Sequence, residues 1–325
     1  MSRYGLRILV VGSGSIGKRH LRNLHLLGYR QLAVCHSQQR PLNEIEAQLG
    51  VRAFHNLDEA LAWDPDVTLV TNPTALHLPT ALAAVQSGSH VLVEKPLSHS
   101  LDGATELESV ATQHHCLGMV AYNLRFCASL GCFRDLLISG VIGRPLTARA
   151  QVGSYLPSWR PHTDYRQVYS TRAELGGGAI LDLSHELDYV LWLLGPSELE
   201  RSAEDTAEIV VRHTSGVLTS VHLDFFDHAA TRGCRIVGTE GTLVWDYFAD
   251  EVQHFDSKRG VWISHSVPTT DRNEMYVAEL RHFLSCVESG TPPLISLQDG
   301  INVLRVALAA KAAASTGIQQ EISHA

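Results

Sequence analysis

Short apolar runs alternate with amphipathic stretches over the first 121 residues of the chain. The runs that predict buried strands cover residues 7–11, 31–35, 51–54, 66–71, 90–93 and 117–121. Helical patterns lie between them, at residues 18–24, 42–49, 58–62, 79–87 and 101–114. Because apolar strands that alternate with helices are typical of parallel sheets, we expect six parallel strands joined by right-handed crossovers. This pattern indicates an α/β fold with a doubly wound parallel sheet.

The hydrophobic pattern changes after residue 122. Apolar and polar positions alternate at residues 146–152, 207–214, 217–226, 234–238 and 241–245, which predicts antiparallel strands with one solvated face. Helices are expected at residues 129–139, 178–194, 274–288 and 299–315. We therefore expect two domains, residues 1–121 and residues 122–325. The second is an α+β domain with an open, mainly antiparallel sheet.

A complete G-x-G-x-x-G sequence follows the first apolar run. Gly12 allows a tight turn, Gly14 lets a pyrophosphate approach the backbone, and Gly17 lets the next helix pack close to the strand. The helix that begins near Ser15 and Ile16 would direct free N–H groups and a positive dipole end at phosphates. An ordinary glycine turn is the alternative. The strand before the motif and the helix after it favour a dinucleotide site, and with it an N-terminal Rossmann domain.

Composition narrows the class of protein. The chain has 325 residues, 45% of them hydrophobic and 18% charged, which is typical of a soluble globular protein. The net charge of −8 argues against a nucleic-acid partner, and no apolar run approaches the length of a membrane span. Six scattered cysteines indicate reduced thiols and a cytoplasmic location. The cluster at residues 114–116 is more typical of a loop than of a zinc site, so no metal is expected.

The residues after the second apolar run bear on the choice of cofactor. An acidic residue there would bind the ribose 2′-hydroxyl of NAD, but this chain continues with His36 and Ser37 and reaches Arg40 three residues later. Ser37 and Arg40 are suited to a 2′-phosphate. We therefore favour NADP(H), with NAD(H) as the alternative.

Lys95 directly follows the fifth predicted strand. Open α/β sheets bind their ligands at the carboxyl ends of the strands, so this position favours an ammonium beside the cofactor. The alternative is an exposed surface lysine.

A second group of polar residues lies on the helix predicted at residues 178–194. At about 100° per residue, Asp182, His185, Glu186 and Tyr189 fall opposite an apolar stripe. Asp182 and His185 are spaced i, i+3, and a histidine held by a carboxylate is the usual general acid/base near neutral pH. A solvated helix face would look the same, above all for Glu186.

Two loops complete the set of candidate residues. Asn72, Pro73 and Thr74 follow the fourth predicted strand and lead to His77, an arrangement that an ordinary Asn-Pro turn also explains. The polar, aromatic segment at residues 155–169 includes Trp159. Long loops of this kind often cover a substrate, although some are only disordered.

These motifs together resemble the Gfo/Idh/MocA oxidoreductase family over nearly the whole chain. The resemblance rests on five stretches, namely Gly12-x-Gly14-x-x-Gly17-x-x-His20, Asn72-Pro73-Thr74-x-x-His77, Glu94-Lys95-Pro96, Tyr122-Asn123-x-Arg125-Phe126 and the glycine-rich turn before Asp182 and His185. It implies that Asn72, Pro73, Thr74, His77, Glu94 and Lys95 contribute to the cofactor site. The family usually has three residues between the Asp and the His, whereas here only two intervene.

The resemblance also implies an activity. Hydride would move between the nicotinamide and a carbinol carbon of a sugar, a nucleotide sugar or a cyclitol. His185 would transfer the proton, Lys95 would hydrogen-bond the reacting oxygen, and Asp182 would orient the substrate and His185. Asn123, Arg125 and Trp159 would contact the substrate. The sheet of the second domain would form the interface of a homodimer or homotetramer.

Two other functions fit the same motifs. One is a glycoside hydrolase that uses a bound NAD for transient oxidation. The other is a non-catalytic regulator that senses a dinucleotide. The joint presence of Lys95, Asp182 and His185 argues against the regulator, because a sensor has no need of an acid/base set.

Overall fold

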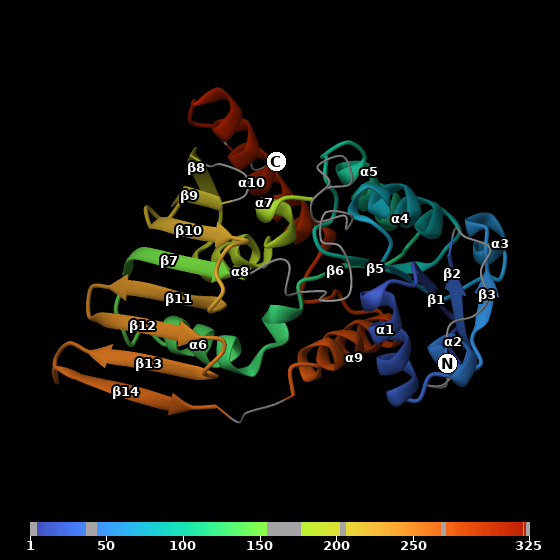
Figure 1. The fold of residues 1–325 in the computed structure, drawn as a ribbon, viewed down its shortest axis with the longest axis horizontal. Coiled ribbons are helices and arrows are strands. Elements are labelled where there is room, and N and C mark those ends of the chain that lie inside the picture. Colours follow the sequence, from blue (N-terminus) through green and yellow to red (C-terminus); the bar gives the residue numbers. More distant parts are fainter. Residues whose placement is uncertain are drawn as a thin grey trace. The chain divides into compact units, whose positions relative to one another are not determined.

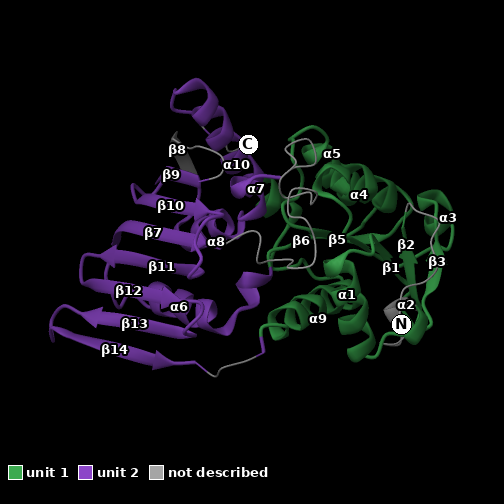
Figure 2. Ribbon diagram, viewed as in Figure 1, with its two compact units in different colours: residues 1–122, 272–301 green, residues 123–271, 302–325 purple. Residues whose placement is uncertain are grey.

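The computed structural model of the chain describes residues 5–36, 44–154, 177–201, 206–267, 271–320 and 322. By their internal contacts the residues divide into two units, shown in Figure 2. The first contains residues 1–122 and 272–301, and the second contains residues 123–271 and 302–325. The sequence analysis placed residues 272–301 with the second domain, and its boundary after residue 121 stays a prediction.

The first unit is built on a six-stranded parallel sheet with the order β3-β2-β1-β4-β5-β6 (Figure 1). Its strands are β1 (Ile8–Val11), β2 (Leu32–Cys35), β3 (Arg52–Phe54), β4 (Val67–Val70), β5 (His90–Glu94) and β6 (Gly118–Ala121). The helices between them are α1 (Ser15–Leu26), α2 (Glu44–Leu49), α3 (Leu57–Leu61), η1 (Thr74–Leu76), α4 (His77–Gln86) and α5 (Ala104–Gln113). All residues of β1, β2 and β4 are buried, as expected for strands covered on both faces. The predicted Rossmann fold and its six strands are confirmed.

Residues 272–301 belong to the first unit because helix α9 (Glu274–Ser289) packs on α1. The side-chain amides of Asn23 and Asn273 exchange hydrogen bonds of 3.3 and 2.8 Å. The guanidinium carbon of Arg19 lies 4.3 Å from the centre of the Tyr276 ring. Helix α10 (Leu297–Thr316) then runs from the first unit into the second.

The second unit contains an eight-stranded sheet with the order β14-β13-β12-β11-β7-β10-β9-β8. The strands are β7 (Pro145–Gly153), β8 (Ser197–Arg201), β9 (Thr206–His213), β10 (Leu218–Asp224), β11 (Thr231–Gly238), β12 (Gly241–Asp246), β13 (Glu251–Asp256) and β14 (Val261–Ser266). Only the pair formed by β7 and β10 is parallel, so the predicted mainly antiparallel sheet is confirmed. The sequence analysis missed β8, β13 and β14. The edge strand β14 has no buried residue, and a strand without a buried face lacks the alternation that identifies strands.

Helices α6 (Ala128–Ile138) and α8 (His185–Leu194) cover one face of this sheet (Figure 1). Trp245 of β12 joins them to it, since its indole N–H donates to Ser129 Oγ at 3.0 Å and its ring meets that of Tyr189 edge-to-face at 5.5 Å. Burial raises the pKa of the Tyr189 hydroxyl well above its ordinary value, and nearby Glu186 adds to this shift. The core of the second unit therefore lies between its helices and the inner face of the sheet.

The prediction of a single helix at residues 178–194 is wrong. The chain forms a short helix α7 (Ala179–Asp182), breaks at Leu183 and Ser184, and begins α8 at His185. The backbone of Leu183 has φ −100° and ψ 30°, outside the helical range. Asp182 and His185 therefore lie at the end of one helix and the start of the next.

The alternative interpretation of this segment, a solvated polar helix face, is wrong. Asp182 is 3% exposed and His185 9%, while Glu186, Asp188 and Tyr189 are fully buried. A helix that carries carboxylates into a core needs buried cations to pair with them, because an unpaired buried charge is very costly. The sequence pattern could not show these partners, since they lie on distant elements.

Two arginines supply the partners. The guanidinium of Arg125 makes a two-pronged contact with the carboxylate of Asp188, at 2.7 and 3.0 Å. Nε of Arg232, on β11, lies 2.8 Å from Glu186 Oε1. These ion pairs hold α8 to the segment before α6 on one side and to the sheet on the other.

We expect Asp188→Ala to lower the free energy of unfolding by about 3–5 kcal/mol, because it leaves Arg125 buried without its counter-charge. Urea unfolding followed by circular dichroism measures this effect. The matched control is Lys258→Ala, which breaks an exposed ion pair with Glu240 and is expected to leave the unfolding midpoint unchanged. Equal effects of the two substitutions would contradict the structural importance of the buried pair.

Candidate functional site

The glycine turn after β1 is shaped by close contacts that admit no side chain at two of its positions. Gly12 has φ +106°, and a Cβ there would lie 2.7 Å from the backbone nitrogen of Asn72. A Cβ on Gly17 would collide with the carbonyl oxygen of Gly12 and lie 2.8 Å from Thr71 Oγ1. Helix α1 is thus seated directly against the turn. These contacts match the roles expected for Gly12 and Gly17.

Gly14 differs from the other two glycines of the motif. Within 4 Å of the position that its Cβ would occupy, the described part of the chain places no atom outside the turn itself. Helix α1 starts at Ser15, and no side chain caps its first N–H groups in the structure as described. Open space beside the N-terminus of a helix of 12 residues suits an anion, so the backbone at Ser15, Ile16 and Gly17 fits a pyrophosphate group.

The turn after β4 borders the glycine turn. Thr71 Oγ1 donates to the carbonyl oxygens of Val11 and Gly12, at 3.0 and 2.8 Å. Asn72 donates its side-chain amide to Thr80 Oγ1 at 2.8 Å, while its Oδ1 is buried and has no hydrogen-bond partner among the described residues. A buried acceptor of this kind is suited to a ligand that carries a donor.

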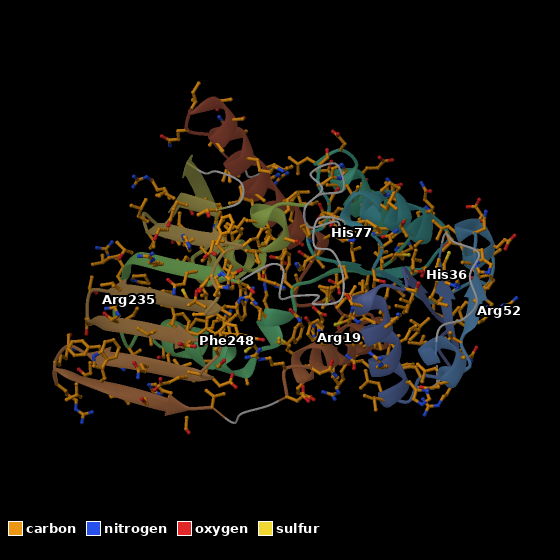
Figure 3. The ribbon with its side chains drawn as sticks, in the orientation of Figure 1. Arg19, His36, Arg52, His77, Arg235 and Phe248 are labelled. Atoms are coloured by element: carbon orange, nitrogen blue, oxygen red, sulfur yellow. The ribbon has the colours of Figure 1, made fainter. Side chains whose placement is uncertain are left out.

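His77 occupies the space between two turns. Its Nε2 lies 2.9 Å from the carbonyl oxygen of Asn72, and its Nδ1 lies 2.9 Å from that of Pro96. The ring is buried, and this burial lowers its pKa. Both ring nitrogens of His77, a residue labelled in Figure 3, therefore lie within hydrogen-bond distance of backbone carbonyls, one in the loop after β4 and one in the loop after β5. A direct contact of His77 with the cofactor stays a prediction, as do those of Pro73 and Thr74.

Lys95 lies in the turn at the carboxyl end of β5, as expected from the sequence. Glu94, the last residue of β5, accepts a hydrogen bond of 3.3 Å from the backbone N–H of Lys95. The other carboxylate oxygen of Glu94 lies 2.8 Å from Nε2 of His20, on α1. The Lys95–Pro96 peptide bond is cis. The contacts of Glu94 are thus internal to the fold, and its predicted contact with the cofactor stays a prediction.

The carboxyl ends of β2 and β3 carry two histidines that the sequence analysis did not single out for binding. The rings of His36 and His55 meet edge-to-face with their centres 4.7 Å apart. Each directly follows a strand of the Rossmann sheet, and that position is the signal that could have found them. Ser37 and Arg40, the residues predicted to hold a 2′-phosphate, lie outside the described residues.

The candidate substrate residues of the second unit are buried. Asn123 and Arg125 lie in the short helix η2 (Asn123–Phe126), 3% and 7% exposed respectively. Arg125 also lies against the Trp192 ring, 5.4 Å from its centre, besides pairing with Asp188. This indicates that Arg125 is a structural anchor of α8, and its contact with substrate stays a prediction. Trp159 lies outside the described residues.

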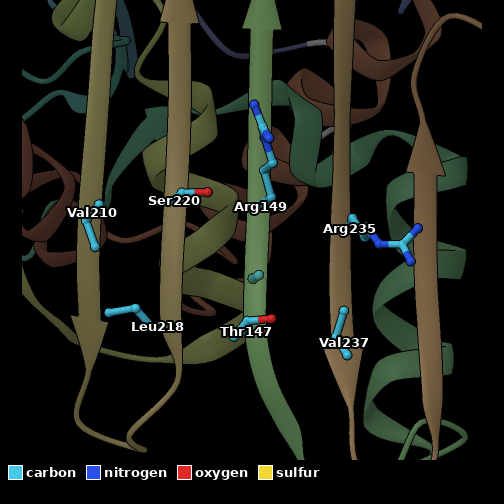
Figure 4. Close-up of a pocket in the computed structure, with 8 residues that line it drawn as sticks. Thr147, Arg149, Val210, Leu218, Ser220, Arg235 and Val237 are labelled. Atoms are coloured by element: carbon cyan, nitrogen blue, oxygen red, sulfur yellow. The ribbon is translucent and has the colours of Figure 1, made fainter.

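A hollow of ≈ 380 Å³ lies on the sheet of the second unit (Figure 4). It is lined by Thr147, Ala148, Arg149, Val210, Leu218, Ser220, Arg235 and Val237. Most of these residues alternate along their strands with the buried positions that face the helices. The hollow therefore opens on the outer face of the sheet, away from Asp182 and His185.

Two features are absent from the described residues. No group of three or more His, Cys, Asp or Glu side chains is placed to hold a metal ion there. Within the same residues, no helix is long and apolar enough to span a membrane.

Comparison with protein families identifies the class of this protein as an NAD-binding Rossmann oxidoreductase. Residues 6–122 match the NAD-binding Rossmann fold of an oxidoreductase family, and residues 134–321 match its C-terminal alpha/beta domain. The chain therefore belongs to the Gfo/Idh/MocA oxidoreductase family, which confirms the resemblance found in its motifs.

Two curated relatives cover most of the chain. The 1,5-anhydro-D-fructose reductase of Ensifer adhaerens is 32% identical over 280 residues, which cover 81% of this chain and 82% of the relative. The myo-inositol 2-dehydrogenase of Thermotoga maritima is 27% identical over 333 residues, which cover 94% and 95% respectively. Both relatives are named as enzymes that reduce or oxidise a sugar-like compound.

Solved structures share the fold. A levoglucosan dehydrogenase in complex with NADH superposes with a TM-score of 0.89 over 98% of this chain and 100% of its own, at 18% identity. A UDP-N-acetylglucosamine 3-dehydrogenase from Acidithiobacillus ferrooxidans superposes with a TM-score of 0.80 over 95% and 97%, at 22% identity.

We expect Gly17→Ala to destabilise the protein by roughly 1–3 kcal/mol, because the new methyl group collides with the Gly12 carbonyl oxygen and forces α1 from the turn. Differential scanning fluorimetry measures this as a lower unfolding temperature. Gly14→Ala is the matched control, since its methyl group meets open space. It should keep the unfolding temperature but weaken NADH binding in a fluorescence titration. An unchanged unfolding temperature in Gly17→Ala would show that α1 is not seated against the turn.

Proposed function

We propose that this protein is an NAD(P)-dependent dehydrogenase or reductase that acts on a hydroxyl-bearing carbon of a sugar, nucleotide sugar or cyclitol. The observation that carries the cofactor part is the glycine turn, where no described atom outside the turn lies within 4 Å of the Cβ position of Gly14, beside the N-terminus of α1. The names of the relatives support the substrate class, because they are reductases and dehydrogenases of such compounds.

The cofactor, when bound, supplies or accepts a hydride at its nicotinamide ring. We assign the proton chemistry to three side chains of this chain. His185 takes the proton from the substrate hydroxyl in oxidation and returns it in reduction, Lys95 donates a hydrogen bond to the reacting oxygen, and Asp182 orients the substrate and His185. Burial of Asp182 and His185 supports these roles, since a site that excludes water strengthens each electrostatic contact.

We further propose a preference for NADP(H) over NAD(H). Strand β2 ends at Cys35, and the next residue is His36 rather than an acid. No carboxylate at that position therefore repels a 2′-phosphate. Ser37 and Arg40 are the residues assigned to hold the phosphate. The observation that favours NAD(H) instead is the NADH bound in the related levoglucosan dehydrogenase structure.

Fluorescence titrations with NADPH and NADH test the cofactor part. We expect tighter binding of NADPH, and a reduction of its advantage over NADH in Arg40→Ala. Equal binding of the two cofactors would refute the preference and leave the dehydrogenase assignment standing. Failure of both to bind a cofactor-free preparation would refute the assignment itself.

A substrate panel tests the reaction. We expect turnover, followed at 340 nm, with at least one of 1,5-anhydro-D-fructose, myo-inositol, levoglucosan and UDP-N-acetylglucosamine. Lys95→Ala and His185→Ala should each lower kcat/KM by about 10²–10⁴-fold, because each removes a group that acts on the proton of the reacting hydroxyl. Lys258→Ala, an exposed lysine, is the control and should keep full activity. Unchanged activity in Lys95→Ala or His185→Ala would contradict the assigned roles.

The outer face of the eight-stranded sheet is our proposed interface of a homodimer or homotetramer. Its hollow combines apolar residues such as Leu218 and Val237 with the cations Arg149 and Arg235. Trp262 on β14 is 47% exposed, and the centre of its ring lies 6.0 Å from the guanidinium carbon of Arg235. Exposed aromatic and arginine side chains are enriched where proteins associate.

We expect Leu218→Glu to convert the oligomer to a monomer in analytical ultracentrifugation, because it introduces a charge into this face. Leu26→Glu is the matched control, since Leu26 is 74% exposed at the end of α1 and lies outside the sheet. A wild-type protein that sediments as a monomer would refute the proposed interface.

A further inference from the structure

One buried side-chain contact joins the glycine-rich helix to the turn that carries Lys95. His20 projects from the second turn of α1 and is 1% exposed. Its Nε2 lies 2.8 Å from Oε1 of Glu94, the last residue of β5. A hydrogen bond to an ionised carboxylate is short and strong, and burial strengthens it further. In the sheet, β5 is separated from β1 by β4. This contact therefore joins α1, the helix that follows β1, to a strand that does not pair with β1.

The second carboxylate oxygen of Glu94 contacts the backbone of the next residue. Oε2 accepts the backbone N–H of Lys95 at 3.3 Å. A carboxylate that His20 holds by one oxygen therefore fixes the backbone of Lys95 with the other. On the far side of Lys95, the carbonyl oxygen of Pro96 lies 2.9 Å from Nδ1 of His77. The backbone of Lys95 is thus held from both sides, by two buried histidines that belong to different helices.

We infer that His20 is a positioning residue for Lys95 and acts through Glu94. The inference deepens the proposed function, because it rests on the role assigned to Lys95 there. His20 keeps the Glu94 carboxylate on the backbone, where it fixes the turn. Without His20, the carboxylate is released to approach the adjacent Lys95 ammonium, an opposite charge, and the turn loses one of its two anchors.

The reactivity of the Lys95 amine reports this position without any substrate. Lysine amines react with acetic anhydride only when uncharged, so a carboxylate that moves onto the ammonium slows the reaction. Mass spectrometry of trace-labelled protein at pH 8 gives the labelling rate of Lys95 relative to that of exposed Lys258 in the same sample. We expect His20→Ala to slow Lys95 labelling by roughly threefold, the effect of a partly exposed ion pair.

Four further variants make the test specific. His20→Gln retains an amide donor for Glu94 and should restore most of the labelling rate. Glu94→Gln removes the carboxylate, so adding His20→Ala in that background should have no further effect. His25→Gln, on the same helix, is the matched control and should label like the wild type. The backbone carbonyl of His25 accepts from Arg30 and from the N–H of Gly28, and among the described residues its Nδ1 has no hydrogen-bond partner.

The outcomes separate this inference from the proposed function. Equal slowing by His20→Ala with and without Glu94→Gln would overturn the inference, as would an unchanged labelling rate in His20→Ala. Full turnover in Lys95→Ala, measured in the substrate panel, would instead refute the role of Lys95. Differential scanning fluorimetry of each variant shows whether it is folded. If His20→Ala does not fold, His20→Gln keeps the inference testable.

Discussion

Helix α1 lies against the glycine turn because residue 17 has no side chain. The space that a Cβ would need is taken by the Gly12 carbonyl oxygen and by Thr71 Oγ1, which itself donates to that carbonyl. This one close approach sets the position of the whole helix. It brings the helix N-terminus beside Gly14, whose Cβ position meets no other described atom within 4 Å, and one turn further on it brings His20 within hydrogen-bond distance of Glu94. The proposed anion site and the Lys95 turn therefore depend on the same packing constraint.

The second unit differs in that it buries charged side chains in its core. Glu186 and Asp188 are fully buried on α8, and each is paired with an arginine from a separate element. Such pairs add little net stability compared with apolar packing, but removing one partner is strongly destabilising. These ion pairs therefore determine the orientation of α8 more than they add to the free energy of folding. The orientation of α8 decides where its first residue, His185, is presented.

Much of the fold could be predicted from the sequence because the buried strands of the Rossmann sheet are nearly pure apolar runs. The glycine turn was equally readable, since Gly12 and Gly17 each have a separate steric reason. The break at Leu183 and Ser184 was not, because both residues fit a continuing helical pattern. The burial of Glu186 and Asp188 could not be foreseen either, since it depends on arginines 46 and 63 residues away along the chain. Contacts of that range leave no local pattern.

A neutral His77 ring can donate a hydrogen bond to only one of the two loops that its nitrogens face. Burial lowers its pKa, so the ring is neutral near pH 7 and carries one N–H, yet both nitrogens lie 2.9 Å from carbonyl oxygens. Only one of the two turns receives that proton in a given tautomer. Each turn has a second bond of its own, from Asn72 to Thr80 in one and from the Lys95 N–H to Glu94 in the other. The turn that receives no hydrogen bond from His77 in a given tautomer still keeps this second bond.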